Sequence, residues 1–236
     1  MIPRALLFDF GGTIDTNGRH WSMMFRRGYH LCGVSATDEE FSRAFGEAEA
    51  DCCDGRIRFT DGLFATLLHQ TRAQAYRLAE GKEDREAQRI YEMAVQVARW
   101  SLREVGETLA SVRPMLIDLH DKFKLGLVSN FYGNLTSVCD ELGLLPLFET
   151  VIDSGCVGVR KPDSGIYRLA LEAMNEEPRR TAMIGDSYAR DIVPAKRVGC
   201  RTIWLHGETW EHPTSPDDAD FIIGSILSVP DILREM

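Results

Sequence analysis

The sequence predicts an α/β protein with a doubly wound parallel sheet and an all-helical segment inserted after the first strand. Short apolar runs alternate with amphipathic helical patterns from about residue 108 onward. One more apolar run, Leu6 to Phe8, opens the chain, and the stretch between the two is rich in Ala, Glu, Arg and Leu and has no proline. We therefore expect a core domain of residues 1–16 and 108–236 and a helical domain of residues 17–107.

The composition is that of an ordinary globular protein and excludes some classes of partner. A formal net charge of −9 argues against nucleic acid or an anionic membrane as the main partner. No apolar stretch approaches the roughly 20 residues that a membrane span needs, and we expect no signal peptide. The six cysteines form no C-x-x-C pair. We expect a cytoplasmic protein, monomeric or homodimeric, that acts on a small molecule.

The first strand delivers a carboxylate to a glycine-rich turn. Leu6 to Phe8 is followed by Asp9, and Gly11 and Gly12 then allow backbone N–H groups to approach an anion closely. The segment from Ile14 to Trp21 is interpreted as an exposed turn.

The inserted segment is predicted to contain three to five helices. Thr37 or Ser35 is the expected N-cap of one, with Phe41, Ala44 and Phe45 at helical spacing. A second helix is expected to start at residues 60–61, and a third to run over residues 83–102.

After Arg113-Pro114, strands and helices are predicted to alternate. The expected strands are 124–129, 149–153, 181–185, 201–205 and 219–223. The expected helices are 112–121, 135–142, 163–174, 189–198 and a short one at the C-terminus. Ligands of such sheets bind at the carboxyl ends of the strands. The polar residues there are Asp9, Ser129, Asn130, Asp153 and Asp186, with Lys161 shortly after the third strand.

Four motifs at these strand ends resemble those of the haloacid dehalogenase (HAD) superfamily, best known for its phosphohydrolases. They are Phe8 to Thr13, Leu127 to Asn130, Arg160 to Pro162 and Ile184 to Asp191. The helical insert is similar to the C1-type cap domain of that superfamily. The resemblance covers the whole chain and implies a Rossmann-like HAD core with a cap over its active site.

The resemblance also implies residue roles in a phosphatase that acts on a small phosphorylated metabolite. Asp9 is the expected nucleophile, which forms an aspartyl-phosphate intermediate. Ser129 and Lys161 are expected to stabilise the phosphate charge, and Asn130 and the backbone N–H groups of Phe10 and Gly11 to contact the phosphate.

Mg²⁺ is the cofactor that the resemblance implies. Its expected ligands are Asp9, Asp186 and the backbone carbonyl of Gly11, with Asp191 binding through a water or orienting the site. Oxygen ligands of this kind suit a hard divalent cation.

One position departs from the superfamily pattern. Its phosphatases usually have an aspartate two residues after the nucleophile, which serves as general acid, and here that residue is Gly11. We expect weak activity on ordinary monoesters, or a substitute acid, for which Asp15, His20 and Tyr132 are candidates.

Two other functions stay open. A 2-haloacid dehalogenase, in which Asp9 attacks carbon without a metal, fits Gly11 and Ser129-Asn130 but gives Asp186 no obvious task. A non-catalytic phosphate-binding protein with the same fold also fits Gly11.

Three segments are the expected sources of substrate contacts. They are the turn at 17–21, the loop at 54–58 with Arg56 and Arg58, and the loop at 206–218 with Glu208, Trp210 and His212.

Overall fold

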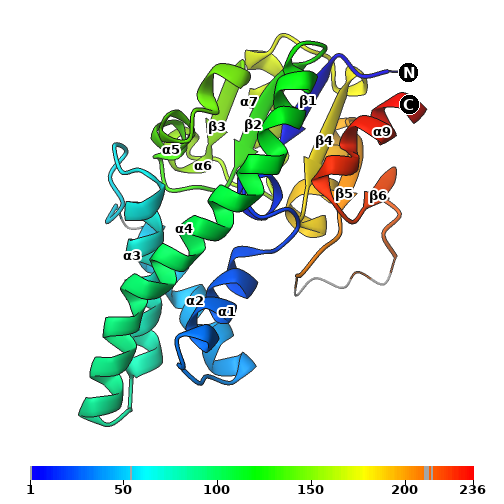
Figure 1. Ribbon diagram of the computed structural model, residues 1–236. Helices are drawn as coiled ribbons and strands as arrows, with labels where there is room; N and C mark the ends of the chain where they lie inside the picture. Colours follow the sequence, from blue (N-terminus) through cyan, green and yellow to red (C-terminus); the bar gives the residue numbers. More distant parts are fainter. Residues whose placement is uncertain (1, 54, 210–212, 214) are drawn as a thin grey trace.

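The structure is a computed structural model that describes residues 2–53, 55–209, 213 and 215–236. Its centre is a six-stranded sheet with the order β3-β2-β1-β4-β5-β6 (Figure 1). The strands are β1 (Ala5–Phe8), β2 (Lys124–Ser129), β3 (Thr150–Asp153), β4 (Thr181–Gly185), β5 (Arg201–Leu205) and β6 (Phe221–Ile223). Every neighbouring pair is parallel, which confirms the predicted fold class.

Helices cover both faces of the sheet. They are α1 (Trp21–Leu31), α2 (Asp38–Cys53), α3 (Leu63–Ala79), α4 (Asp84–His120), α5 (Leu135–Glu141), α6 (Ser154–Val157), α7 (Gly165–Ala173), α8 (Val193–Val198) and α9 (Val229–Glu235). Successive residues of β1 point to opposite faces. Leu6 and Phe8 join the core cluster that contains α4 and α9, while Ala5 and Leu7 join the one that contains α7 and α8. A parallel sheet buried on both faces explains why its strands are continuously apolar.

Helix α4 differs from the prediction. Two helices were expected, one ending near residue 102 and one starting at 112, but a single helix runs from Asp84 to His120 with Pro114 inside it. Proline removes the hydrogen bond to the carbonyl of Ala110, four residues earlier. Both residues are exposed, so water can hydrate that carbonyl, while the buried face continues unbroken through Val112 and Leu116.

The segment between β1 and α1 also differs from the prediction of an exposed turn. Asp15, Thr16 and Gly18 are buried, and Trp21 is only 7% exposed. The side chain of Asp15 accepts hydrogen bonds from the Gly12 N–H at 2.8 Å and from the Trp21 indole. This contact fastens the start of α1 to the turn after Asp9.

Helices α1 to α3 and the first part of α4 lie beyond one end of the sheet (Figure 1). The N-terminus of α2 is capped by Thr37, whose Oγ1 accepts from the Glu40 N–H at 3.2 Å, so Thr37 and not Ser35 is the cap. Helix α4 crosses the boundary expected between residues 107 and 108 without a break. The division into core and helical domains stays a prediction.

Among the described residues, no helix is both long and apolar enough to cross a membrane.

Candidate active site

The side chains of Asp9, Ser129 and Lys161 meet at the carboxyl ends of the central strands. Asp9 follows β1, and its Oδ1 accepts a hydrogen bond from Ser129 Oγ at 2.8 Å. Lys161 Nζ lies 2.6 Å from the same oxygen and 2.6 Å from Asp191 Oδ1. All four residues are buried. Residues from four parts of the chain therefore form one charged cluster.

Asp186 and Asp191 complete this cluster from the segment after β4. Asp186 Oδ1 accepts from Thr13 Oγ1 at 3.2 Å, and Asp191 Oδ2 accepts from the Ser187 N–H at 3.0 Å. Each carboxylate is thereby oriented by a hydrogen bond from a neighbouring loop. The three carboxylates lie close together, since one oxygen from each of Asp9, Asp186 and Asp191 lies within 4.8 Å of the other two.

Burial and mutual repulsion shape the electrostatics of these groups. Burial, followed by the charges of Asp9 and Asp191, raises the pKa of Asp186 well above its ordinary value. Burial also raises the pKa of Asp191 to about 6, although Lys161 counteracts it. For Lys161, burial alone would lower the pKa, but Asp191 and Asp9 outweigh it and the pKa is raised. The lysine therefore stays charged, and the cluster contains more carboxyl groups than positively charged groups.

The donor set fits a divalent cation such as Mg²⁺. Asp186 Oδ2 is buried and has no hydrogen-bond partner among the described residues. Three carboxylates face a single ammonium group, that of Lys161. A hard cation with oxygen ligands would pair the orphaned oxygen and balance the excess charge.

The two glycines after Asp9 have different requirements. Gly12 has φ +94°, and a Cβ there would lie 2.4 Å from Asp186 Oδ2, so only glycine lets this carboxylate approach the turn. Gly11 has φ −74°, and its Cβ would lie 3.7 Å from the Trp21 indole, an ordinary contact. The backbone at position 11 therefore does not require glycine. The absence of the expected aspartate removes a carboxyl group from the site and is not imposed by the shape of the turn.

A pocket of about 340 Å³ opens on the cluster. From the predicted set it is lined by Asp9, Gly11, Ser129, Asn130, Lys161, Asp186 and Asp191. The side chain of Phe10 lies instead in the core, against Phe131. Asn130 uses its amide on the backbone of Lys161, from which Oδ1 accepts at 2.8 Å and to which Nδ2 donates at 3.0 Å. Its contact with phosphate stays a prediction.

Asp153, at the end of β3, supports the site from outside the pocket. Its carboxylate accepts hydrogen bonds from the backbone N–H groups of Gly133, Leu135 and Gly155 at 2.8–3.0 Å. It therefore fixes the loop that follows Ser129.

Of the three candidate substitutes for the general acid, His20 and Tyr132 line the pocket and Asp15 does not. Burial raises the pKa of Asp15 to about 7, but its carboxylate is engaged by Gly12, Thr16 and Trp21. The Tyr132 hydroxyl donates to Glu49 at 2.5 Å, and burial raises the pKa of Tyr132 well above its ordinary value. Asp15 therefore connects the turn after Asp9 to α1 and does not line the pocket.

Of the three segments expected to contact substrate, the turn at 17–21 contributes His20 and Trp21 to the pocket wall, and the other two lie mostly elsewhere. Arg56 and Arg58 do not line the pocket. Glu208 pairs with Arg19 at 2.9 Å, and Trp210 and His212 lie outside the described residues.

The pocket wall also contains residues that the sequence interpretation did not assign. Phe45 and Glu49 lie one helical turn apart on α2, and Arg160 and Arg190 lie beside Lys161 and Asp191 in the chain. One signal in the sequence could have indicated Glu49. It follows Phe45 by four residues, so it lies on the apolar face of an amphipathic helix, where a carboxylate is unusual.

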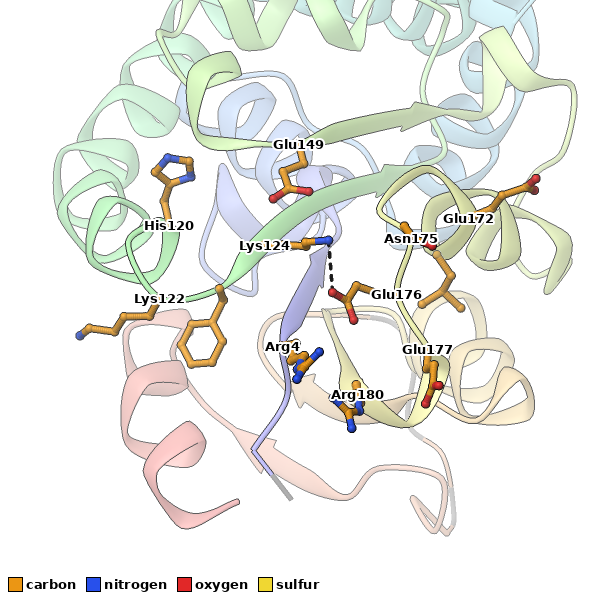
Figure 2. A pocket seen from close by; sticks show the side chains of 12 residues that line it. Arg4, His120, Lys122, Lys124, Glu149, Glu172, Asn175, Glu176, Glu177 and Arg180 are labelled. Carbon is orange, nitrogen blue, oxygen red and sulfur yellow. Dashed lines mark ion pairs between the residues drawn. The ribbon is translucent and has the colours of Figure 1, made fainter.

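A second, larger groove lies at the other end of the strands. It measures about 960 Å³ and is lined by residues such as Arg4, Lys124 and Arg180, which precede or begin strands (Figure 2). Lys124 in this groove is already paired with Glu176 at 3.2 Å, the contact marked in Figure 2. None of the four motifs contributes to it, whereas residues from all four line the smaller pocket.

Part of the chain is similar in sequence to known phosphatases. Glyceraldehyde 3-phosphate phosphatase of Pyrococcus abyssi is 36% identical over 108 residues, 44% of this chain and 43% of that protein. This chain spans about half the length of the curated relatives it matches.

Two solved structures share the fold over nearly the whole chain. A HAD phosphatase from Thermococcus onnurineus has a TM-score of 0.54 at 22% identity and covers 98% of this chain and 97% of its own. A 2-haloacid dehalogenase from Pseudomonas syringae has a TM-score of 0.53 at 20% identity and covers 100% and 99%. At these identities the similarity shows the fold and does not separate the two chemistries.

The model of the haloacid dehalogenase-like hydrolase family matches residues 3–199. The matched range contains all four motifs and every residue of the Asp9 cluster. The chain belongs to the haloacid dehalogenase-like hydrolase family.

Proposed function

We propose that this protein is a Mg²⁺-dependent phosphatase that acts on a small phosphorylated metabolite through an aspartyl-phosphate at Asp9. The observation that carries the proposal is the cluster in which Lys161 and Ser129 hold Asp9 while Asp186 and Asp191 lie beside it. Relatives named for glyceraldehyde 3-phosphate and phosphoserine support the substrate class.

The residues divide the work of phosphoryl transfer. The Asp9 carboxylate attacks phosphorus, the bond to the leaving oxygen breaks, and water later cleaves the acyl phosphate. The Lys161 ammonium, the Ser129 hydroxyl and the N–H groups of Phe10 and Gly11 stabilise charge on the transferring oxygens. Fixed donors in a dry pocket stabilise such charge without having to reorganise.

Asp9, Asp186 and the Gly11 carbonyl would hold Mg²⁺, with Asp191 placed to orient them. When bound, the cation supplies charge stabilisation for the phosphate. The Lys161–Asp191 ion pair keeps the ammonium in place during the reaction.

Gly11 provides no acid for the leaving group. A positioned acid contributes typically about 10²–10⁴-fold. The proposed enzyme therefore favours acyl and aryl phosphates, whose leaving groups depart as stabilised anions, over alkyl phosphates of equal fit.

Dehalogenation is the second candidate function. Gly11 favours it, since displacement of halide needs no acid. The buried Asp186, whose Oδ2 has no partner among the described residues, favours the metal-dependent phosphatase instead. A non-catalytic role is not favoured, because burial of this many charges is costly unless the site is used.

Release of phosphate from acetyl phosphate and p-nitrophenyl phosphate tests the proposal, with Mg²⁺ or EDTA and with Asp9→Asn as control. We expect turnover that requires both Mg²⁺ and Asp9. Turnover of 2-chloropropionate in EDTA, without phosphate release, would favour the dehalogenase. Binding of phosphate without turnover of either class would indicate the non-catalytic role.

The proposal includes a cytoplasmic location, which is supported by a composition without paired cysteine motifs, and a monomer or homodimer.

A further inference from the structure

The helical wall of the pocket carries one carboxylate that the proposed chemistry does not use. Glu49 Oε1 accepts hydrogen bonds from Gln70 Nε2 at 2.6 Å and from the Tyr132 hydroxyl at 2.5 Å. These donors come from α3 and from the loop after β2, and Gln70 is only 1% exposed. Two donors from different segments fix the orientation of the carboxylate, so it is a built part of the pocket.

The second oxygen of Glu49 has no such partner. The hydrogen bonds recorded for this carboxylate among the described residues all reach Oε1. Burial raises the pKa of Glu49, against the opposing effects of Tyr132 and Gln70. This oxygen is therefore available to accept a hydrogen bond from an O–H or N–H group of a ligand in the pocket.

Two arginines give the same pocket positive charge. Arg160 donates to Cys53 Sγ at 3.3 Å, and Arg190 donates to Ser187 Oγ at 3.3 Å. Within the described part of the chain, neither guanidinium lies in an ion pair with a carboxylate, while Lys161 is already shared by Asp9 and Asp191. Their charge is therefore available to an anionic group other than the reacting phosphate.

We infer that Glu49, Arg160 and Arg190 form a recognition subsite for the leaving group of the substrate. The leaving group carries a carboxylate, which the arginines bind, and beside it a hydroxyl or ammonium donor, which Glu49 binds. The substrate class is thus a phosphate monoester of a small hydroxy acid or amino acid, a size that suits a pocket of about 340 Å³. This inference rests on the proposed phosphatase function, since it assigns the rest of the same substrate.

The test compares kcat/KM for four phosphate esters. 3-Phosphoglycerate and phosphoserine carry both groups, 3-phosphooxypropanoate lacks the donor, and glycerol 3-phosphate lacks the carboxylate. We expect one of the first two to exceed each of the last two by about 10- to 100-fold, the effect of losing a hydrogen bond to a charged group. The better of the two identifies the donor as hydroxyl or ammonium.

Variants connect this preference to the subsite. Glu49→Gln should remove the preference over 3-phosphooxypropanoate, and Arg160→Gln with Arg190→Gln the preference over glycerol 3-phosphate. Glu47→Gln is the matched control, because Glu47 lies on the same helix, pairs with Arg77 at 3.4 Å and does not line the pocket. It should leave both preferences unchanged.

Equal kcat/KM for all four esters, or a preference over 3-phosphooxypropanoate that survives Glu49→Gln, would overturn the inference. Acetyl phosphate, which has neither group, reports on the proposed function separately, since its turnover needs only Asp9 and its neighbours. Calorimetric binding of the four esters to Asp9→Asn makes the same comparison without turnover, and equal affinities there would also overturn the inference.

Discussion

Restoring the aspartate at position 11 should change which phosphate esters are hydrolysed. The Gly11 backbone has φ −74°, and a Cβ would contact the Trp21 indole at 3.7 Å, so Gly11→Asp fits without strain. We expect its free energy of unfolding to stay within about 1 kcal/mol of wild type, because a non-glycine residue also restricts the unfolded chain. The structural perturbation is therefore small and the chemical one large.

The magnitude follows from the leaving group. A positioned acid contributes about 10²–10⁴-fold, or about 2.7–5.5 kcal/mol of barrier. Gly11→Asp should raise kcat/KM for glycerol 3-phosphate by at least about 100-fold and leave acetyl phosphate within about threefold. Phosphate release under subsaturating substrate measures both.

Gly11→Asn is the control, since it has nearly the same shape and no acid. An equal gain in both variants would mean that packing and not proton transfer is responsible. No gain with Gly11→Asp in a folded protein would refute the account of the missing acid and favour a substitute such as His20, which lines the pocket.

Three further changes test other parts of the site. Gly12→Ala places a Cβ 2.4 Å from Asp186 Oδ2 at φ +94°, and urea unfolding should show a loss of at least about 1–3 kcal/mol that Gly11→Ala does not share. Lys161→Met should lower kcat for acetyl phosphate by about 10²–10³-fold, with an unchanged circular dichroism spectrum as the check on folding. Because the pKa of Asp15 rises from 3.8 to about 7 on folding, the folded state holds a proton that the unfolded chain releases, and stability falls as pH rises through that window. Urea unfolding in EDTA should show a fall of roughly 2 kcal/mol between pH 5 and pH 7 from this group, and Asp15→Asn should remove it; an equally steep fall in the variant would contradict the assignment.

The parallel sheet was predictable because its central strands are buried on both faces and end in recognisable turns. The strands β2, β4 and β5 begin and end at the predicted residues. Helix α4 was not predictable in the same way, since Pro114 is a local signal for a break. Its exposed position, which depends on the tertiary packing, makes an unbroken helix tolerable.

The cluster around Asp9 was predictable because parallel strands bring their carboxyl ends to one edge. The prediction that Asp15 lies in an exposed turn is wrong. Its carboxylate is held by the Trp21 indole, and the local pattern around Asp15 does not show that this indole packs against it. Glu49 was missed for a similar reason. Its partners Gln70 and Tyr132 are 21 and 83 residues away in the chain, and only the fold brings them together.

The most direct test of the central claim is to trap the phosphorylated protein. The protein is mixed with acetyl phosphate and Mg²⁺, quenched in acid, digested and examined by mass spectrometry. The account predicts one phosphoryl group on the peptide that contains Asp9, absent in EDTA and absent in Asp9→Asn. A phosphoryl group on another residue, or undiminished phosphate release by Asp9→Asn, would contradict it.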